Sequence, residues 1–510
     1  MRKLDRDTLN GYVCAVKIVI WMLLAALAIS QSAAQTNLPV PPQSMVTNTV
    51  PPPPLPGINI PPAPLVPRPL DPYLLPMTNR TPRPKAIPPP SMPVSGGELI
   101  RQQMRLQPPP PTAASLAATQ AITYVEPRLP APPPAVSNRV FHVAMNGDDK
   151  NDGSQESPWR TLQKAANTAE AGDTVLVAKG AYDGFQTKHS GKPGRPITFK
   201  ADGKVIIVSN NNNPPDHILV RGTDWIVIEG FTLRYAPRAG IGVLDSSDVI
   251  IRDNVCVSNQ VWGIFSGFAP RIQVLNNKAF GSKEQHGIYI SNSRDPSDNP
   301  VLRGNECFEN AASGIQLNGD CNMGGDGIIN GALLENNIVR DNDSKGMSLI
   351  SIEGSLIRNN LIYNNGRVSG AGGIHLTDQL GCGNPSRRNT IVNNTILEPR
   401  IVPIRLSDGA RDNILFNNLL IGPHGIVDEV GDNAIDTESN LHTDKPSDVF
   451  IAADTLDFHL QINGPACYRG RTAYSEHQAP TRDFEGRPRP PTAPSIGAYD
   501  VELPPPATKP

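Results

Sequence analysis

The chain has 510 residues, of which 54 are proline and 43 glycine, while only 18% are charged and 5% are aromatic. The 46 basic and 48 acidic residues nearly cancel, which argues against a nucleic-acid-binding protein that works through bulk charge. The six cysteines form no CxxC pair, so the pattern also argues against a zinc or thioredoxin-like site.

Residues 1–34 are predicted to form a cleavable export signal. Basic residues precede an apolar run from Ile18 to Ile29, and the small residues Ser32, Ala33 and Ala34 suit a cleavage site. The apolar run has about 12 residues, whereas a bilayer span needs about 20. We therefore expect a secreted, periplasmic or cell-surface protein that meets a membrane only if the signal stays uncleaved.

Residues 35–138 are predicted to be a disordered, Pro-rich linker. Of the 54 prolines, 30 fall between Pro39 and Pro134. Each proline fixes φ and removes an N–H donor, which favours extended polyproline II over a packed core. We interpret the segment as a spacer, with a docking site for a proline-binding partner as the alternative. The folded mass is therefore expected in 139–500, and 501–510 is expected to be a disordered tail.

The folded part is repetitive. Seven short segments such as VLNNKA and IVNNTI share an asparagine at spacings of 23 to 34 residues, and most repeats add a short strand such as GIYISN or GIHLTD. A period near 23 residues, with insertions in some repeats, is typical of a parallel solenoid. The aligned asparagines are Asn254, Asn277, Asn305, Asn337, Asn360, Asn394 and Asn418.

These repeats predict an all-β fold, a right-handed parallel β-helix of about eight to ten coils. The strands are too short to bury a face alone, so the coils must stack at about 4.8 Å and share a core. The asparagines are interpreted as a structural ladder at the turns, because asparagine tolerates left-handed turn geometry. The inward aliphatic column is expected to be Ile241, Ile264, Ile288, Ile315, Met347, Ile374 and Ile404.

Both ends of the solenoid are expected to be covered. Pro158 to Ala171 is predicted to be a helix that caps the N-terminal coil. The irregular chain from Asp457 onward is expected to fold back as the C-terminal cover.

The cysteines fall into two predicted groups. Cys256 and Cys307 occupy inward positions two coils apart and are expected to be packed thiols. Cys321 and Cys382 both follow the same type of strand in extended loops, so these two could form a disulfide in an exported protein, with free thiols as the alternative.

The two ends of the folded part carry a family resemblance. The stretch from Phe141 to Tyr182 resembles the start of secreted bacterial right-handed β-helix proteins of the pectate-lyase-like superfamily, and Phe484 to Asp500 resembles their closing motif. The resemblance implies the fold and a carbohydrate partner, but the superfamily holds lyases, hydrolases, epimerases, esterases and proteins without known catalysis. The NTD, DD, GHG and RIK set of polygalacturonases is not found, and the segment Asp295 to Asp298 departs at its third residue from the DPHD signature of mannuronan epimerases.

In this architecture, the outward face of one stacked sheet is expected to form a long groove suited to an extended polymer. Aligned strands place two polar clusters there, the first around Tyr289 with Asn292 and the second around His375. The candidate catalytic residues are His286, Tyr289, His375 and Arg405. The candidate substrate-binding residues are Gln316, Asn318, Asp378 and Asp408, and the candidate metal ligands are Asp320 and Asp326.

These residue types suit β-elimination on a polymer that contains uronic acids. A base must remove the C5 proton, which is acidic only when the neighbouring carboxylate is neutralised by Arg, an amide or a cation. Asp320 and Asp326, with Asn318, offer oxygen ligands of the kind that Ca²⁺ prefers. The leading hypothesis is therefore an exported polysaccharide lyase, with Ca²⁺ as its candidate cofactor.

Two alternatives remain open. A glycoside hydrolase needs two carboxyl groups about 5–5.5 Å or about 6.5–9.5 Å apart, and Asp378 and Asp408, expected on neighbouring coils about 4.8 Å apart, could supply them. The second alternative is a non-catalytic surface or matrix protein that only binds glycan. In each case the expected partner is a polysaccharide rather than a nucleic acid, and the expected oligomeric state is a monomer.

Overall fold

The computed structural model describes residues 139–210, 215–291, 298–431 and 435–501. The predicted export signal, the Pro-rich linker and residues 502–510 lie outside the described residues, as do Asn292 and most of the Asp295–Asp298 segment. Within the described ranges, no helix is long and apolar enough to span a membrane.

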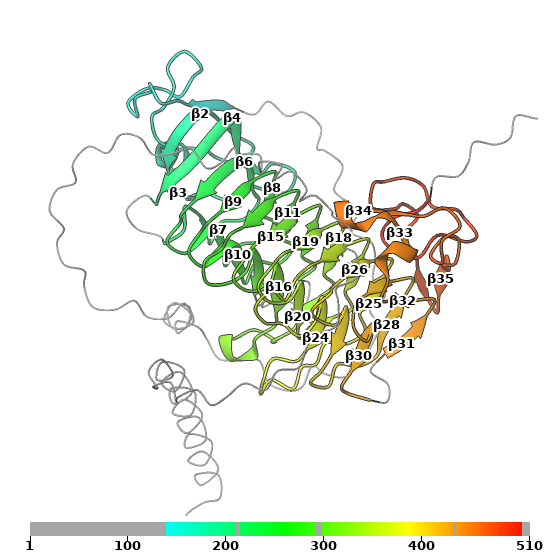
Figure 1. The fold of residues 1–510 in the computed structure, drawn as a ribbon. Helices are drawn as coiled ribbons and strands as arrows, with labels where there is room; N and C mark the ends of the chain where they lie inside the picture. Colours follow the sequence, from blue (N-terminus) through cyan, green and yellow to red (C-terminus); the bar gives the residue numbers. More distant parts are fainter. Residues whose placement is uncertain (1–138, 211–214, 292–297, 432–434, 502–510) are drawn as a thin grey trace, which may run out of the picture. The chain divides into compact units, whose positions relative to one another are not determined.

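The described chain forms a parallel β-helix, as predicted, but with about 11 turns rather than eight to ten (Figure 1). One wall is a ten-stranded parallel sheet, which we call the front sheet. Its strands are β3 (Phe185–Gln186), β5 (Ile218–Arg221), β7 (Ala239–Leu244), β10 (Trp262–Gly267), β13 (Ile288–Ser291), β16 (Ile315–Asn318), β20 (Met347–Ile350), β24 (Ile374–Thr377), β27 (Ile404–Leu406) and β30 (Ile426–Asp428).

The other walls are two series of parallel strands within one 20-stranded sheet, joined where β2, β4 and β6 run through both. The first series is β1 (Val140–Val143), β2 (Thr174–Asp183), β4 (Ile197–Ser209), β6 (Ile226–Arg234), β8 (Ile250–Arg252), β11 (Gln273–Leu275), β14 (Val301–Arg303), β18 (Leu333–Glu335), β22 (Leu356–Arg358), β25 (Thr390–Val392), β28 (Asn413–Phe416) and β31 (Ile435–Glu438). The second series is β9 (Val255–Val257), β12 (Lys278–Phe280), β15 (Glu306–Phe308), β19 (Ile338–Arg340), β23 (Leu361–Tyr363), β26 (Thr395–Leu397), β29 (Leu419–Ile421) and β32 (Leu441–Thr443).

Small elements complete the fold. A pair of two-residue parallel strands joins β17 (Ile329–Asn330) to β21 (Ile352–Glu353). Two antiparallel hairpins follow the last coil: β33 (Phe450–Ala452) with β34 (Asp457–Leu460), and β35 (Ala473–Tyr474) with β36 (His477–Gln478). Short 3₁₀ turns lie at Cys321–Met323, Pro446–Asp448 and Ala453–Thr455.

The core is the predicted aliphatic stack. Strand pairing aligns Ile264 with Ile288 and Ile315 with Met347, and every member of the predicted inward column is fully buried. The thiols of Cys256 and Cys307 also lie in this core, two coils apart, with Ala279 between them in register. Burial raises the pKa of both thiols, so both stay protonated packing groups, as expected.

The predicted asparagine ladder is confirmed at the turns between the two rear series. Each side-chain amide accepts a hydrogen bond from the asparagine of the preceding coil and donates one to a backbone carbonyl of that coil. In Asn277, for example, Oδ1 accepts from Asn254 Nδ2 at 3.0 Å, and Nδ2 donates to Ile251 O at 2.9 Å. The ladder continues one coil beyond the prediction, to Asn440. It therefore satisfies buried backbone groups that each turn would otherwise leave without a partner.

A second ladder, which the sequence analysis missed, lies at the turns leading into the front sheet. Asn310 donates to Asn342 Oδ1 at 2.9 Å, and Asn342 donates to Asn365 Oδ1 at 2.8 Å. At its end stands a carboxyl group: Asn365 donates its backbone N–H and its Nδ2 to Glu398, each at 2.7 Å. Glu398 is fully buried, and this burial raises its pKa to about 8.

Glu398 should make stability depend on pH. Because its folded pKa of about 8 exceeds the ordinary 4.5, the folded state keeps a proton that the unfolded chain releases. The stability from this group is full below pH 4.5 and falls by about 1.4 kcal/mol per pH unit up to about pH 8. We expect Glu398→Gln to flatten this fall in urea unfolding measured between pH 5 and 8, while Glu284→Gln, at an exposed position, leaves it unchanged. Equal slopes for Glu398→Gln and wild type would show that Glu398 folds as a carboxylate.

The N-terminal cap is shorter than predicted. The helix α3 covers Leu162–Ala166, and Thr161 caps it by accepting from Lys164 N at 3.1 Å. Leu162, Ala165 and Ala166 are buried in the main core against the first coils. The predicted capping helix is therefore present, but the residues that flank it within 158–171 are not helical.

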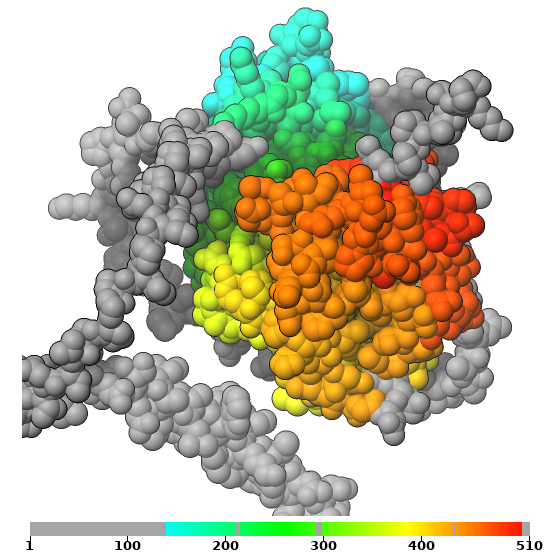
Figure 2. All heavy atoms as spheres, turned by 45° about the vertical axis from the view of Figure 1, so that its right-hand side comes forward, coloured from blue at the N-terminus to red at the C-terminus, as the bar shows by residue number. Residues whose placement is uncertain are grey.

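The C-terminal prediction was wrong in its location. The chain from Asp457 to Val501, which we call the C-terminal segment, packs on the outer side of the second rear series and covers a flank of the solenoid rather than its end (Figure 2). Four outward asparagines, each directly before a ladder residue, bind the backbone of the C-terminal segment. Their Nδ2 groups donate from Asn336 to Phe484 O, from Asn359 to Arg482 O, from Asn393 to Ser495 O and from Asn417 to Arg471 O. In each of these Asn-Asn pairs, the second residue therefore belongs to the inner ladder and the first binds the C-terminal segment.

Candidate functional site

The strand register aligns one outward column of side chains along the front sheet, which contains the predicted Tyr289 and His375. Phe265 pairs with Tyr289, Tyr289 with Gln316, and the column continues through Ser348, His375 and Arg405. A parallel stack in register keeps alternate side chains on one face, so these groups share the outer face of the solenoid.

The first polar cluster is held together by Tyr289. The His286 ring meets the Tyr289 ring edge-on, with centroids 5.5 Å apart, and Asn318 Nδ2 donates to the Tyr289 hydroxyl at 3.3 Å. His286 Nδ1 accepts from Ser313 N at 3.1 Å, which fixes the turn of the next coil. Burial lowers the pKa of His286 to about 4 and raises that of Tyr289, so both side chains are neutral at neutral pH.

The second polar cluster is a chain of hydrogen bonds that ends on Asp408. His375 Nε2 lies 2.9 Å from Ser407 Oγ, and both Ser407 Oγ and Thr377 Oγ1 donate to Asp408 Oδ2, at 2.8 and 2.7 Å. The two hydroxyls lower the pKa of Asp408. Arg405 is paired with Glu429, which directly follows β30. The cluster therefore combines a fixed carboxylate, an imidazole and a guanidinium.

Lys345 also belongs to this cluster, although the sequence analysis did not select it. Its Nζ donates to Ser348 Oγ at 3.4 Å, and its pKa is lowered by burial and by the charge of Arg405, against the opposing effect of Asp408. Burial, Lys345 and Arg405 together lower the pKa of His375 to about 3. Lys345 precedes Gly346 as His286 precedes Gly287, so aligning the repeats one residue earlier would have found it.

The two predicted substrate-binding carboxylates are held by different partners. Asp378 Oδ1 accepts from Ser351 Oγ at 3.2 Å and from Asn384 N at 3.1 Å, whereas Asp408 accepts from Thr377 and Ser407. Asp408 is held in its ionised form by these bonds. A glycosidase pair needs one protonated carboxyl group, and Asp408 does not suit that role.

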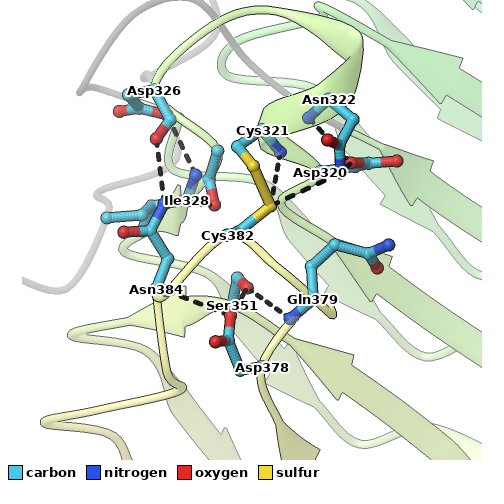
Figure 3. The surroundings of a disulfide bond; sticks show 11 residues. Asp320, Cys321, Asn322, Asp326, Ile328, Ser351, Asp378, Gln379, Cys382 and Asn384 are labelled. Carbon is cyan, nitrogen blue, oxygen red and sulfur yellow. Dashed lines mark hydrogen bonds between the residues drawn. A yellow bond between two sulfur atoms is a disulfide. The ribbon is translucent and has the colours of Figure 1, made fainter. Parts of the chain in front are cut away.

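Cys321 and Cys382 form a disulfide, which the sequence analysis had left open, and it joins two long loops across the intervening coil (Figure 3). The candidate metal ligands Asp320 and Asp326 flank it on opposite sides. Asp320 accepts from Asn322 N at 2.9 Å, and Asp326 accepts from Ile328 N at 3.0 Å, so each carboxylate shapes its own turn. The sulfurs beside Asp320 are bonded to each other and are not thiolate ligands. The calcium role of these two residues stays a prediction.

Two hollows of the described surface lie away from the two polar clusters. Cavities of about 410 and 660 Å³ open near the last coils, and His424 and His442 line both. Of the predicted site residues, none lines either cavity.

Two family models match the chain. The model described as "Pel9A-like, right handed beta helix region" matches residues 141–295, and that described as "Right handed beta helix region" matches 285–443. Each model spans about a third of the chain, and both describe right-handed β-helix regions, in agreement with the observed fold.

Two curated proteins are similar to part of the chain. An uncharacterised protein, YwoF, of Bacillus subtilis is 27% identical over 246 residues, which is 45% of this chain and 47% of its own length. A mannuronan C5-epimerase of Pseudomonas putida is 26% identical over 243 residues, 48% of this chain and 37% of its own length. The chain thus spans less than half the length of each relative.

Among solved structures, pectate lyase Pel9A has a similar fold. The similarity has a TM-score of 0.53 at 17% identity and covers 72% of this chain and 97% of Pel9A. At this identity the likeness concerns the fold alone.

Proposed function

We propose that this protein is exported, binds an acidic polysaccharide on the outer face of the front sheet and cleaves it by β-elimination. The observation that carries the proposal is the Lys345–His375–Arg405–Asp408 cluster, which combines two cations, a neutral imidazole and an ionised carboxylate on one outward face. The similarity to a mannuronan C5-epimerase supports an acidic polymer as the substrate class.

The cluster offers a division of roles. Arg405, positioned by Glu429, faces the sugar carboxylate and makes the C5 proton more acidic. Lys345 is the better base, because a general base works best when its pKa lies near the working pH, and the pKa of Lys345 is lowered from 10.5 towards that range. His375, with a pKa of about 3, is too weak a base and is left as a binding group.

The step is a balanced elimination. Lys345 Nζ takes the C5 proton, a C4–C5 double bond forms, and the C4–oxygen bond breaks. The leaving oxygen then takes a proton from water or from the lysine ammonium. Tyr289, Gln316 and Asn318 lie two to three strands along the column, where they would contact neighbouring sugars.

The test is an ultraviolet assay on the purified protein with a panel of acidic and neutral polysaccharides, with and without Ca²⁺. New absorbance from unsaturated ends with one acidic polymer is the expected result. Altered C5 configuration without cleavage would instead indicate an epimerase. Silence across all acidic polymers would contradict the lyase proposal, and reducing-end and binding assays would then separate a hydrolase from a glycan-binding scaffold. Loss of absorbance on removing Ca²⁺ would support a calcium role for Asp320 and Asp326.

A further inference from the structure

The hydrogen bonds around Asp408 determine where the proton of the His375 ring lies. A hydroxyl has a single proton to donate, and a carboxylate is a stronger acceptor than a neutral group. The hydroxyls of Ser407 and Thr377 both lie within 2.8 Å of Asp408 Oδ2 and give it their protons. Ser407 Oγ therefore has only lone pairs left for His375.

It follows that His375 Nε2 carries the ring proton and donates it to Ser407 Oγ at 2.9 Å. The ring is neutral at working pH, so Nδ1 is a bare acceptor. Among the described residues, Nδ1 has no hydrogen-bond partner, although the residue is only 7% exposed. A buried acceptor left without a donor is unfavourable, and a ligand that supplies the donor would remove that penalty.

The surroundings restrict that donor. Lys345 and Arg405 act on the ring as positive charges, so an ammonium donor is repelled and an anionic ligand is attracted. A second buried acceptor without a partner among the described residues, Asn318 Oδ1, lies two strands away on the same sheet. Both unmatched atoms are acceptors, and hydroxyl groups are the donors that a sugar offers.

We propose that His375 is a specificity-determining residue whose Nδ1 accepts a hydrogen bond from a free hydroxyl of the acidic sugar bound against Lys345 and Arg405. A sugar whose hydroxyl is O-acetylated at that position has no proton to donate and leaves Nδ1 unmatched. The protein therefore prefers acidic polymers without O-acetyl groups. This inference rests on the proposed function of the same face.

The test compares one polyuronate before and after chemical O-acetylation, by affinity electrophoresis with the full-length protein. Wild type should bind the unmodified polymer about tenfold or more tightly. His375→Met, which lacks the acceptor, should bind both forms with equal affinity. Ser407→Ala leaves the His375 ring in place but removes the hydrogen bond that keeps the ring proton on Nε2. It should therefore reduce the difference in affinity between the unmodified and the O-acetylated polymer. It also keeps the test valid if His375→Met does not fold.

The outcomes separate the two proposals. Failure of wild type to bind or cleave any acidic polymer would overturn the proposed function and this inference with it. Normal binding with equal affinity for the two forms of the polymer would overturn the inference alone. A preference that persists unchanged in both His375→Met and Ser407→Ala would assign the selectivity to another residue and would also overturn it.

Discussion

Lys345→Met should lower kcat/KM for eliminative cleavage by about 10²–10⁴-fold, the usual contribution of a positioned general base. The substitution removes the amine whose pKa is lowered by burial and by Arg405. Lys345→Arg is the informative partner, because it keeps the positive charge but cannot give up its proton at any working pH. Initial rates of ultraviolet absorbance on the active polymer measure both variants.

The two variants distinguish a base from a charge. If Lys345 is the base, both variants lose activity, and the wild-type rate rises with pH through a pKa below 10.5 because the neutral amine is the active form. Recovery of most of the activity in Lys345→Arg would instead show that only the charge matters. Lys283→Met, at an exposed position in an earlier turn, is the matched control and should leave the rate unchanged.

Most of the fold could be predicted because a solenoid repeats its core at a fixed place in each coil. Ile288 and Ile315 share a core position for the same physical reason, and the alternation of each strand then places Tyr289 and Gln316 on the outer face. The ladder at Asn277 was predictable in the same way, since each coil leaves the same turn to be satisfied.

The rest of the site could not be predicted from a single column. Lys345 lies directly before the glycine that opens the strand motif, so an alignment that starts at the glycine passes over it. The chain Asp408–Ser407–His375 depends on side-chain directions at a strand end, which periodicity does not define. The place of the C-terminal segment depends on outward contacts that do not repeat, such as the one between Asn359 and Arg482.

Arg489→Met should have the largest effect on stability. The Arg489 side chain is only 2% exposed and pairs with Asp500 at 3.3 Å, while its Nη2 donates to Asn359 Oδ1 at 2.9 Å and to the carbonyls of Gly497 and Ala498. One guanidinium thus joins the C-terminal segment to itself and to the coil beneath it. Removing one partner of a buried ion pair costs about 3–5 kcal/mol, because the other charge stays buried without compensation.

Denaturant unfolding should therefore show a loss of about 3–5 kcal/mol, and limited proteolysis should cut the C-terminal segment while the coils stay resistant. Arg469→Met, at an exposed arginine of the same segment, should change neither measurement. Replacing Asp500 with Asn in Arg489→Met removes the stranded charge and should restore part of the stability, since the cost lies in the unpaired carboxylate. An unchanged unfolding free energy in Arg489→Met would mean that apolar contacts, such as Phe458 against Tyr363, hold the flank without the ion pair.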